Sequence, residues 1–351
     1  MRVYRYPENP LVTPEMVTPT RPDFEVVCAF NAGVTRYKDE IILLLRVAEW
    51  AKPDEFTARV PILTCQSGAE PCINIYEFQK NDPMIDFRDS RAVVTPQGTY
   101  LTTISHLRVA RSKDGRHFTV DPKPAVFPDR LSESFGIEDP RITEIDGKYY
   151  IAYKSVAPEG IGVSMAVTED FVTFKKNGMI FCPENLDVCI FPEKVNGRYA
   201  ALHRPVPRYM GTPNMWIAYS PDMVSWGDHQ FLMGVQKDAW DSARIGGGAI
   251  PIKTERGWLE IYHGATSEDV YALGAVLLDL ENPHKIIARG KEPILCPEAP
   301  YEKSGFMPNV VFTCGALVNG DTVSIYYGAS DWVMAGADMS ISEMLDSLTP
   351  A

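Results

Sequence analysis

The feature that most constrains the fold of this chain is a polar turn followed by a short apolar or aromatic strand, repeated along its length. The turn glycines stand about 50 to 60 residues apart. A second pattern, a polar turn closed by an aromatic residue, follows three of these units. This period predicts a β-propeller, which is built of four-stranded blades. The first pattern occupies residues 38–44, 97–101, 146–151, 196–200, 256–261 and 319–323, and the second occupies 112–118, 168–174 and 220–226.

The period leaves the number of blades open. An all-β sandwich also has short strands and turn signals, but it has no reason for a repeat near this length, so we favour the propeller. Six strand pairs fit six blades. They fit five blades equally well if the first and last strands of the chain share one blade and close the ring.

We expect one domain over residues 1–351. Residues 1–27 contain five prolines and are predicted to form an extended segment over the body, well suited to shaping the mouth of a channel. Residues 332–351 are predicted to be a C-terminal tail with a short helix, in which Ser340 is the N-cap and Met344 and Leu345 share an apolar face. That helix would dock on the propeller or on a partner subunit of a homo-oligomer.

Composition excludes several classes of partner. The chain has 351 residues with a formal net charge of −12, which argues against nucleic acid. No apolar run approaches the ~20 residues of a membrane helix, and the N-terminus lacks the apolar core of a signal peptide. Seven scattered cysteines show no CxxC pair and no metal-ligand spacing. We therefore expect reduced thiols, a cytoplasmic protein and no metal.

The segment from Phe135 to Thr143 concentrates charge at the start of an apolar strand. Glu138, Asp139 and Arg141 fall within four residues, so at least one carboxylate must be desolvated when the strand is buried. Such a group is either a structural ion pair or a carboxyl whose pKa is set for chemistry. Residues 88–91 (RDSR) precede another apolar run in the same way, which favours strand starts that face a common centre.

In a propeller the innermost strand of each blade lines the central channel, so its polar strand starts would meet there. Carboxylates and amides around one pocket suit a polyhydroxylated ligand, because hydroxyls need both donors and acceptors. The candidates are Asn31, Asp89, Asp139, Asp187, Asn309 and Asp331.

Four of the repeated strands end in a cation or a histidine at equivalent places. Each residue alone would be a solvated strand end, but together, in an acidic protein, they predict an anion site, and arginine with histidine suits phosphate. The residues are Arg46, Lys154, His203 with Arg204, and Tyr262 with His263.

With these motifs in hand, the chain resembles glycoside hydrolase family 130, the β-mannoside phosphorylases and related mannosidases. The resemblance covers nearly the whole chain and is carried by FGIEDPRIT (135–143), LHRP (202–205), YHG (262–264) and ASD (329–331). It implies a five-bladed propeller and a reaction in which inorganic phosphate attacks the anomeric carbon with inversion, giving α-mannose 1-phosphate. Phosphate would be the co-substrate, with no cofactor and no catalytic base.

The resemblance also implies roles for individual residues. Asp139 would be the general acid, its proton passing through a sugar hydroxyl. From the pattern of strand ends we expect Arg46, Lys154, Arg204, Tyr262 and His263 to bind phosphate, and we expect Asn31, Asp89, Glu138, His203 and Asp331 to bind the β-mannoside.

Linkage and reaction type remain open at this stage. The run from Asn9 to Val26 looks most like the group acting on β-1,2-linked mannosides, so we expect phosphorolysis of β-1,2-mannobiose and its longer homologues. The alternatives are a β-1,4-mannoside phosphorylase, a hydrolase, which would need a carboxylate base to activate water, and a glycan-binding propeller without activity. The basic strand ends favour a phosphorylase over a hydrolase.

Overall fold

The computed structural model describes residues 1–65 and 70–351, and these form an all-β protein with only short helices. The first group of strands comprises β2 (Phe24–Tyr37), β3 (Glu40–Ala51), β8 (Ile104–Ser112) and β9 (Thr119–Val120). The second comprises β10 (Gly136–Ile145), β11 (Lys148–Ala157), β12 (Gly160–Thr168) and β13 (Lys175–Phe181). Neighbouring strands are antiparallel within each group, and one parallel contact of β8 with β10 joins the two groups.

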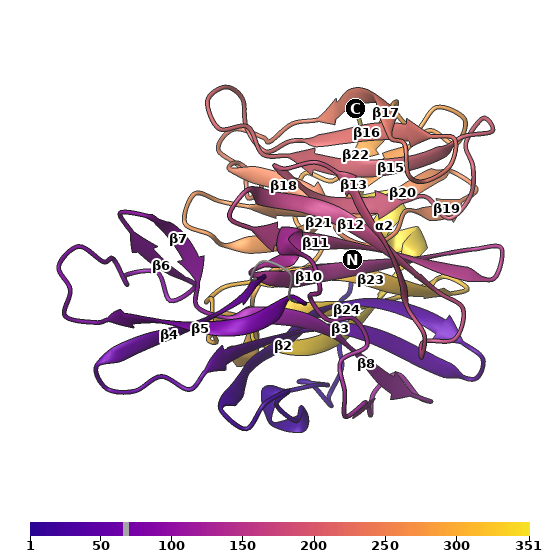
Figure 1. Cartoon of the computed structure of the whole chain (residues 1–351). Helices are drawn as coiled ribbons and strands as arrows, with labels where there is room; N and C mark the ends of the chain where they lie inside the picture. Colours follow the sequence, from indigo (N-terminus) through magenta and orange to yellow (C-terminus); the bar gives the residue numbers. More distant parts are fainter. Residues whose placement is uncertain (66–69) are drawn as a thin grey trace.

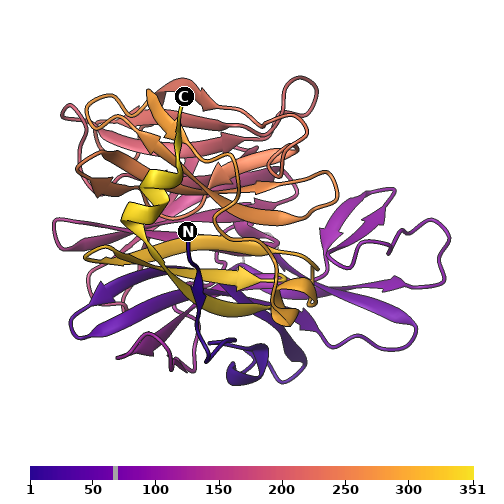
Figure 2. The same ribbon diagram turned by 180° about the vertical axis from the view of Figure 1, so that it is seen from behind.

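Three further antiparallel groups follow along the chain (Figures 1 and 2). One holds β14 (Asn185–Ile190), β15 (Tyr199–Pro205), β16 (Met215–Ser220) and β17 (Gly227–Met233). The next holds β18 (Arg244–Gly247), β19 (Ile252–Thr254), β20 (Gly257–Ala265), β21 (Tyr271–Leu278), β22 (Ile286–Arg289) and β26 (Thr349–Pro350). The last holds β23 (Val311–Asn319), β24 (Thr322–Ala329), β25 (Val333–Ser340) and the N-terminal β1 (Tyr4–Arg5).

The core lies between successive groups. Apolar residues of the first and second groups pack together, as do those of the second with the third, the third with the fourth and the fourth with the last. The last group also packs against the first, where Tyr326 and Met334 join Leu43 and Leu45. Strands such as β3, β10 and β20 are buried over almost their whole length because both of their faces meet a neighbouring group.

The two ends of the chain differ from the expected tails. β1 pairs with β25, as anticipated for a shared sheet, and one 3-10 turn, Pro14–Met16, interrupts the N-terminal segment. Residues 333–340 are the strand β25 and not part of a tail. Helix α2 (Ile341–Ser347) follows, capped by the Ser340 hydroxyl, which accepts from the Glu343 amide. Its apolar face packs into the core of its own chain.

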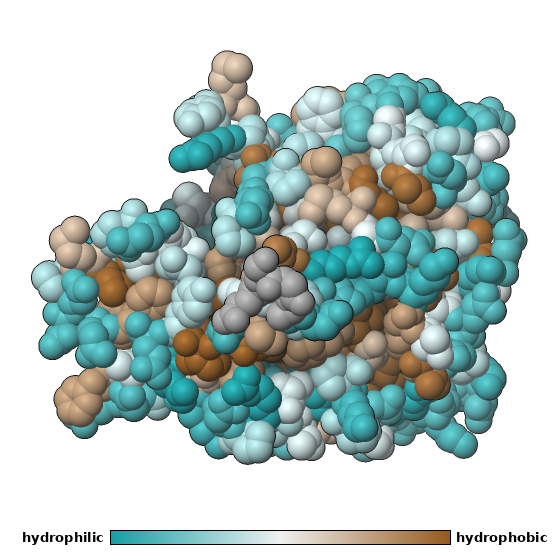
Figure 3. Space-filling view, in the orientation of Figure 1, coloured by the Kyte–Doolittle hydropathy of each residue, from teal (hydrophilic) through white to brown (hydrophobic). Residues whose placement is uncertain are grey.

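A lobe stands off the body between β3 and β8. We use this name for residues 52–65 and 70–103, which include the hairpins β4 (Thr57–Thr64) with β5 (Cys72–Gln79) and β6 (Ala92–Thr95) with β7 (Gly98–Leu101). It extends to the left in Figure 1, and Figure 3 shows polar and apolar residues mixed on its surface. The repeat that starts at residue 97 thus belongs to a two-stranded hairpin and not to an innermost strand.

Two other short helical elements complete the described chain. The 3-10 turn Leu131–Glu133 precedes β10, and α1 (Pro300–Lys303) precedes β23. No helix in the described residues is long and apolar enough to cross a membrane.

Candidate active site

A cavity of about 160 Å³ opens where the first strands of several groups meet. Six of the predicted site residues line it, contributed by three different groups and by the turn after β24. These residues come from places up to 300 positions apart in the sequence (31 to 331) and are brought together only by the fold. They are Asn31, Arg46, Asp139, Lys154, Arg204 and Asp331.

Equivalent β-bulges in β2, β10 and β14 aim polar side chains inward. The pairing register shifts next to Asn31, Asp139 and Asp187, and these residues have φ angles of 45°, 48° and 56°. Asparagine and aspartate tolerate this left-handed region better than most residues, and a bulge redirects the side chain that it carries. The polar strand starts predicted from the sequence are therefore bulges that face one another.

Close backbone approach makes room for two of these side chains. A Cβ at Gly328 would collide with the Asn31 side chain, and a Cβ at Gly246 would collide with the Asp187 carboxylate. Both positions therefore require glycine for steric reasons, although neither has a positive φ.

Asp139 is held by three side chains. Its Oδ1 accepts from Asn31 Nδ2 at 3.0 Å and from an Arg46 terminal nitrogen at 3.1 Å, and its Oδ2 accepts from Lys154 Nζ at 2.5 Å. Burial raises the pKa of this carboxyl, but the positive charges of Lys154 and Arg46 lower that pKa by more than burial raises it. The pKa of Asp139 consequently lies well below its ordinary value, and the group is ionised in the free protein.

Asp187 forms a second buried centre beside the first. It accepts from Arg204 Nε at 2.6 Å and from a terminal nitrogen of Arg141 at 3.2 Å, and Lys154 Nζ lies 3.7 Å away. Burial again works against ionisation, but Arg204 and Lys154 hold the pKa of Asp187 well below its usual range. Lys154 therefore links the two carboxylates.

Arg141 has a structural role: its guanidinium connects neighbouring strands through hydrogen bonds. Besides Asp187, its guanidinium donates to the backbone oxygens of Gly247 and Gly248 at 2.7 and 3.0 Å, and to the Asp139 carbonyl at 3.3 Å. It ties three groups of strands together beneath the cavity. The charge next to Asp139 in sequence thus fixes the backbone, while Arg46 and Lys154 set the pKa of the carboxyl.

Two other carboxyls have pKa values that are raised. Burial is the main cause for Asp331, whose pKa rises to about 6; Arg46 lowers it in part and Asp139 raises it further. Burial also raises the pKa of Glu138, although Arg46 donates to its Oε1 at 2.6 Å. Glu138 does not line the cavity itself, but it binds Arg46, which does.

Two predicted phosphate ligands do not reach the cavity. His263 is fully buried behind Asp187, with Nε2 3.3 Å from Oδ2, and burial lowers its pKa to about 4, so the ring is neutral near pH 7. The Tyr262 hydroxyl donates to Asp241 Oδ2 at 3.0 Å on the other face of its strand. Neither side chain lines the cavity, which corrects the direct phosphate contacts predicted for both: Tyr262 points to the opposite face of the strand from His263, and His263 contacts Asp187 instead.

Two predicted sugar ligands also lie elsewhere. His203 points away from Arg204, bonds Asn185 and His229, each at 3.1 Å, and has its pKa lowered to about 3 by burial. Asp89 belongs to the lobe, where it pairs with Arg91, and does not line the cavity. The analogy between residues 88–91 and 138–141 fails because the first precedes a hairpin and the second an inner strand. The N-terminal segment contributes no lining residue either.

Sequence reasoning missed half of the lining. Phe312 provides an aromatic wall, 4.4 Å between ring centroids from His263 and 5.7 Å from Lys154 Nζ. Asn309, a predicted candidate, stops short of the cavity. Most of the missed residues are apolar or fall in connections without a repeat, so no sequence signal marks them. The lining residues not anticipated are Arg91, Leu186, Asp269, Tyr271, Met307, Val310 and Phe312.

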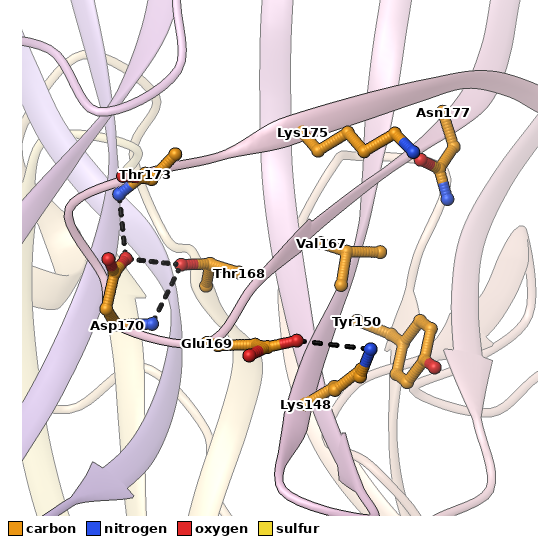
Figure 4. A pocket seen from close by; sticks show the side chains of 9 residues that line it. All are labelled: Lys148, Tyr150, Val167, Thr168, Glu169, Asp170, Thr173, Lys175 and Asn177. Carbon is orange, nitrogen blue, oxygen red and sulfur yellow. Dashed lines mark hydrogen bonds and ion pairs between the residues drawn. The ribbon is translucent and has the colours of Figure 1, made fainter.

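A wider groove of about 470 Å³ lies on the edges of β11, β12 and β13 (Figure 4). Lys148 and Glu169 form an ion pair across it at 3.1 Å, and Asp170 closes a local turn with Thr168 and Thr173. Both charges of that ion pair are more than half exposed. The groove lacks the converging buried charges of the smaller cavity, so the smaller one is the candidate active site.

Comparison with known proteins identifies the family of the chain. Residues 90–349 match the family model for glycoside hydrolase family 130, described as β-1,4-mannooligosaccharide phosphorylase. The chain belongs to this family. It is 47% identical over 352 aligned residues, covering 99% of each chain, to a β-1,2-mannobiose phosphorylase from Listeria innocua.

Two further comparisons refine the picture. A 1,2-β-oligomannan phosphorylase from Thermoanaerobacter is 44% identical over 72% of this chain and 83% of its own length. The solved structure of the Listeria innocua β-1,2-mannobiose phosphorylase in complex with β-1,2-mannobiose superimposes with a TM-score of 0.95 over 99% of both chains. The resemblance to the β-1,2 group of the family, predicted from the N-terminal run, is confirmed.

Proposed function

We propose that this enzyme catalyses the reversible, inverting phosphorolysis of β-1,2-mannobiose and longer β-1,2-linked mannosides, giving α-mannose 1-phosphate. The observation that carries the proposal is the buried carboxylate Asp139 at the base of a cavity lined by four cations, in a chain 47% identical along its whole length to a β-1,2-mannobiose phosphorylase. The acidic protein concentrates positive charge where an anionic co-substrate would bind.

Asp139 is the general acid in this proposal. The carboxyl is ionised in the free protein, so it must gain a proton before it can donate one. A phosphate dianion beside Arg46 and Lys154 competes for the charges that depress the pKa of Asp139, and this raises the pKa toward the working range. Hydrogen phosphate loses one proton as it becomes a sugar phosphate, and the leaving mannose gains one, so no separate base is needed.

Arg46, Lys154 and Arg204 form the phosphate site. All three line the cavity, and guanidinium groups suit the tetrahedral anion because they offer paired donors. Asp187 orients Arg204 and Lys154 through the contacts described above, and neutral His263 supports Asp187 from behind. Asn31 and Asp331 bind hydroxyls of the donor mannose, where Asp331 accepts hydrogen bonds.

We also propose that the fold is a five-bladed propeller, that phosphate is the only co-substrate and that the protein works in the cytoplasm. Five antiparallel groups with five apolar layers between them, the last returning to the first, support the blade count. The β1–β25 pair then closes the ring within one blade.

Initial rates with β-1,2- and β-1,4-mannobiose, each with phosphate, test the linkage. The two substrates share the donor ring, so a difference reports the acceptor side alone. We expect kcat/KM at least about tenfold higher for the β-1,2 disaccharide, the scale set by misplaced hydrogen bonds. A tenfold preference for β-1,4-mannobiose would overturn the linkage but not the acid or the phosphate site.

A further inference from the structure

The lobe contributes one side chain to the cavity, Arg91. The lobe is anchored at its base, where Val60, Ile62 and Val93 pack against Phe135 and Val156 of the second group. This anchor lies next to the strand that carries Asp139. The lobe is thus packed onto the body at its base, while its hairpins extend to one side of the body in Figures 1 and 2.

The position of Arg91 is set by Asp89. The Asp89 carboxylate accepts from the Arg91 amide at 2.9 Å, from Nε at 3.0 Å and from one terminal nitrogen at 2.8 Å. The Thr102 amide donates to the Arg91 carbonyl at 3.0 Å and holds the backbone from the other side. The second terminal nitrogen has no partner among the described residues and is available to a ligand.

Depth in the cavity distinguishes Arg91 from the other cations. Its side chain is 47% exposed, whereas those of Lys154 and Arg204 are 10% and 8% exposed. A donor sugar must reach Asp139, whose side chain is 3% exposed, and therefore lies deep. The cavity of about 160 Å³ is smaller than the ~300 Å³ at which pockets for drug-sized ligands begin, so the second sugar of a disaccharide must extend through the mouth.

We propose that Arg91 binds the leaving sugar, the mannose released from mannobiose, donating hydrogen bonds to its hydroxyls, and that Asp89 is the positioning residue for that contact. The inference rests on the proposed phosphorolysis and adds the residue that reads the acceptor. Inversion places the nucleophile on the opposite face of the donor ring from the leaving sugar. A cation at the mouth therefore meets the acceptor, while the deep cations meet phosphate.

The chain supplies a matched control. Arg88 repeats the geometry of Arg91 three residues earlier, with its amide and its guanidinium donating to Asp86, but its side chain is 91% exposed and does not line the cavity. R91A and R88A thus each remove an arginine from an Asp-x-Arg turn of the lobe, and only R91A changes the mouth.

The experiment measures KM for all four reactants in both directions. R91A should raise KM for the acceptor mannose in synthesis, and for mannobiose in phosphorolysis, by about 10- to 100-fold, the range for a lost hydrogen bond to a charged group. KM for phosphate and for mannose 1-phosphate should change by less than about twofold. D89N should shift the same two constants by a smaller factor, because the arginine remains but is less firmly oriented.

Three results would overturn the inference: unchanged acceptor KM in R91A, an equal rise in KM for phosphate, or an equal effect of R88A. Thermal unfolding of each variant separates loss of fold from loss of binding. Absence of phosphate-dependent turnover in the wild-type enzyme would instead refute the proposed function itself, and with it any role of Arg91 in acceptor binding.

Discussion

The inner bulges and the lobe face the same cavity but hold their charges in opposite ways. At the bulges, Asp139 and Asp187 are buried and share Lys154 between them, so each charge has several partners. On the lobe, the Arg91 side chain is half-exposed and pairs with only one side chain of the described residues, that of Asp89. Buried, shared charges suit chemistry, because their pKa values respond strongly to what binds. An exposed arginine that is held by one carboxylate suits substrate recognition, since its loss leaves the buried charge network intact.

Among substitutions in the buried charge network, D139N should have the largest effect on activity. Asparagine cannot donate an acidic proton, so we expect kcat with β-1,2-mannobiose to fall by about 10²-fold or more. A mannoside with an activated leaving group needs less protonation and should lose much less. E138Q, which also touches Arg46 but lies outside the cavity, serves as the neighbouring control. Near-normal turnover of β-1,2-mannobiose by D139N would show that another group is the acid.

The next effect concerns phosphate. R204A removes a lining cation while leaving Asp187 paired with Arg141 and close to Lys154, so the fold should persist. We expect KM for phosphate to rise about tenfold or more and KM for mannobiose to change by less than about twofold. R198A, on the exposed turn before β15, is the matched arginine control. Parallel rises for both substrates would mean that Arg204 supports the site as a whole.

The smallest effect is on stability and concerns Asp331. Its pKa is about 6 in the native protein against 3.8 in an exposed carboxyl. The native state therefore binds more protons than the unfolded state between these values, so stability falls as pH rises from about 4 to about 6 and then levels off. The D331N variant lacks the titrating carboxyl and therefore should not show this fall in the free energy of unfolding. Relative to wild type, the variant should gain about 1–3 kcal/mol in free energy of unfolding between pH 4 and pH 7.

Denaturant unfolding of both proteins at several pH values measures this difference. Curves that stay parallel across the range would place Asp331 in a solvated setting with an ordinary pKa. They would also weaken its assignment to the donor subsite, where burial beside Asp139 is the cause of the shift.

The comparison also explains what the sequence could predict. The repeat in the sequence marks the buried charged residues of the site. Polar residues at equivalent strand starts indicated Asn31, Asp139 and Asp187, and cations at strand ends indicated Arg46, Lys154 and Arg204. The alternation of a strand was the missing constraint for Tyr262 and His203. His203 is adjacent to Arg204, which lines the cavity, and Tyr262 is adjacent to His263, which contacts Asp187, so the motif named the right strand end but the wrong face.

On the lobe, the repeat falls at residues 97–101 and does not mark Arg91, the residue that reaches the cavity. Residues 88–91 resemble the EDPR motif in composition, and only the pairing of β6 with β7 reveals that they precede an isolated hairpin. The prediction therefore favoured Asp89 over its partner Arg91. Apolar lining residues such as Phe312 carry no local signal, because burial in a core and exposure in a cavity select the same residue types.

The most direct test of the account is to identify, by proton and phosphorus NMR, the products that the wild-type enzyme forms from β-1,2-mannobiose with and without inorganic phosphate. The account predicts that sugar release requires phosphate and that the first product is mannose plus α-mannose 1-phosphate in equal amounts. Release of two mannose molecules at the same rate without phosphate would contradict it, because the cation-lined cavity would then serve hydrolysis.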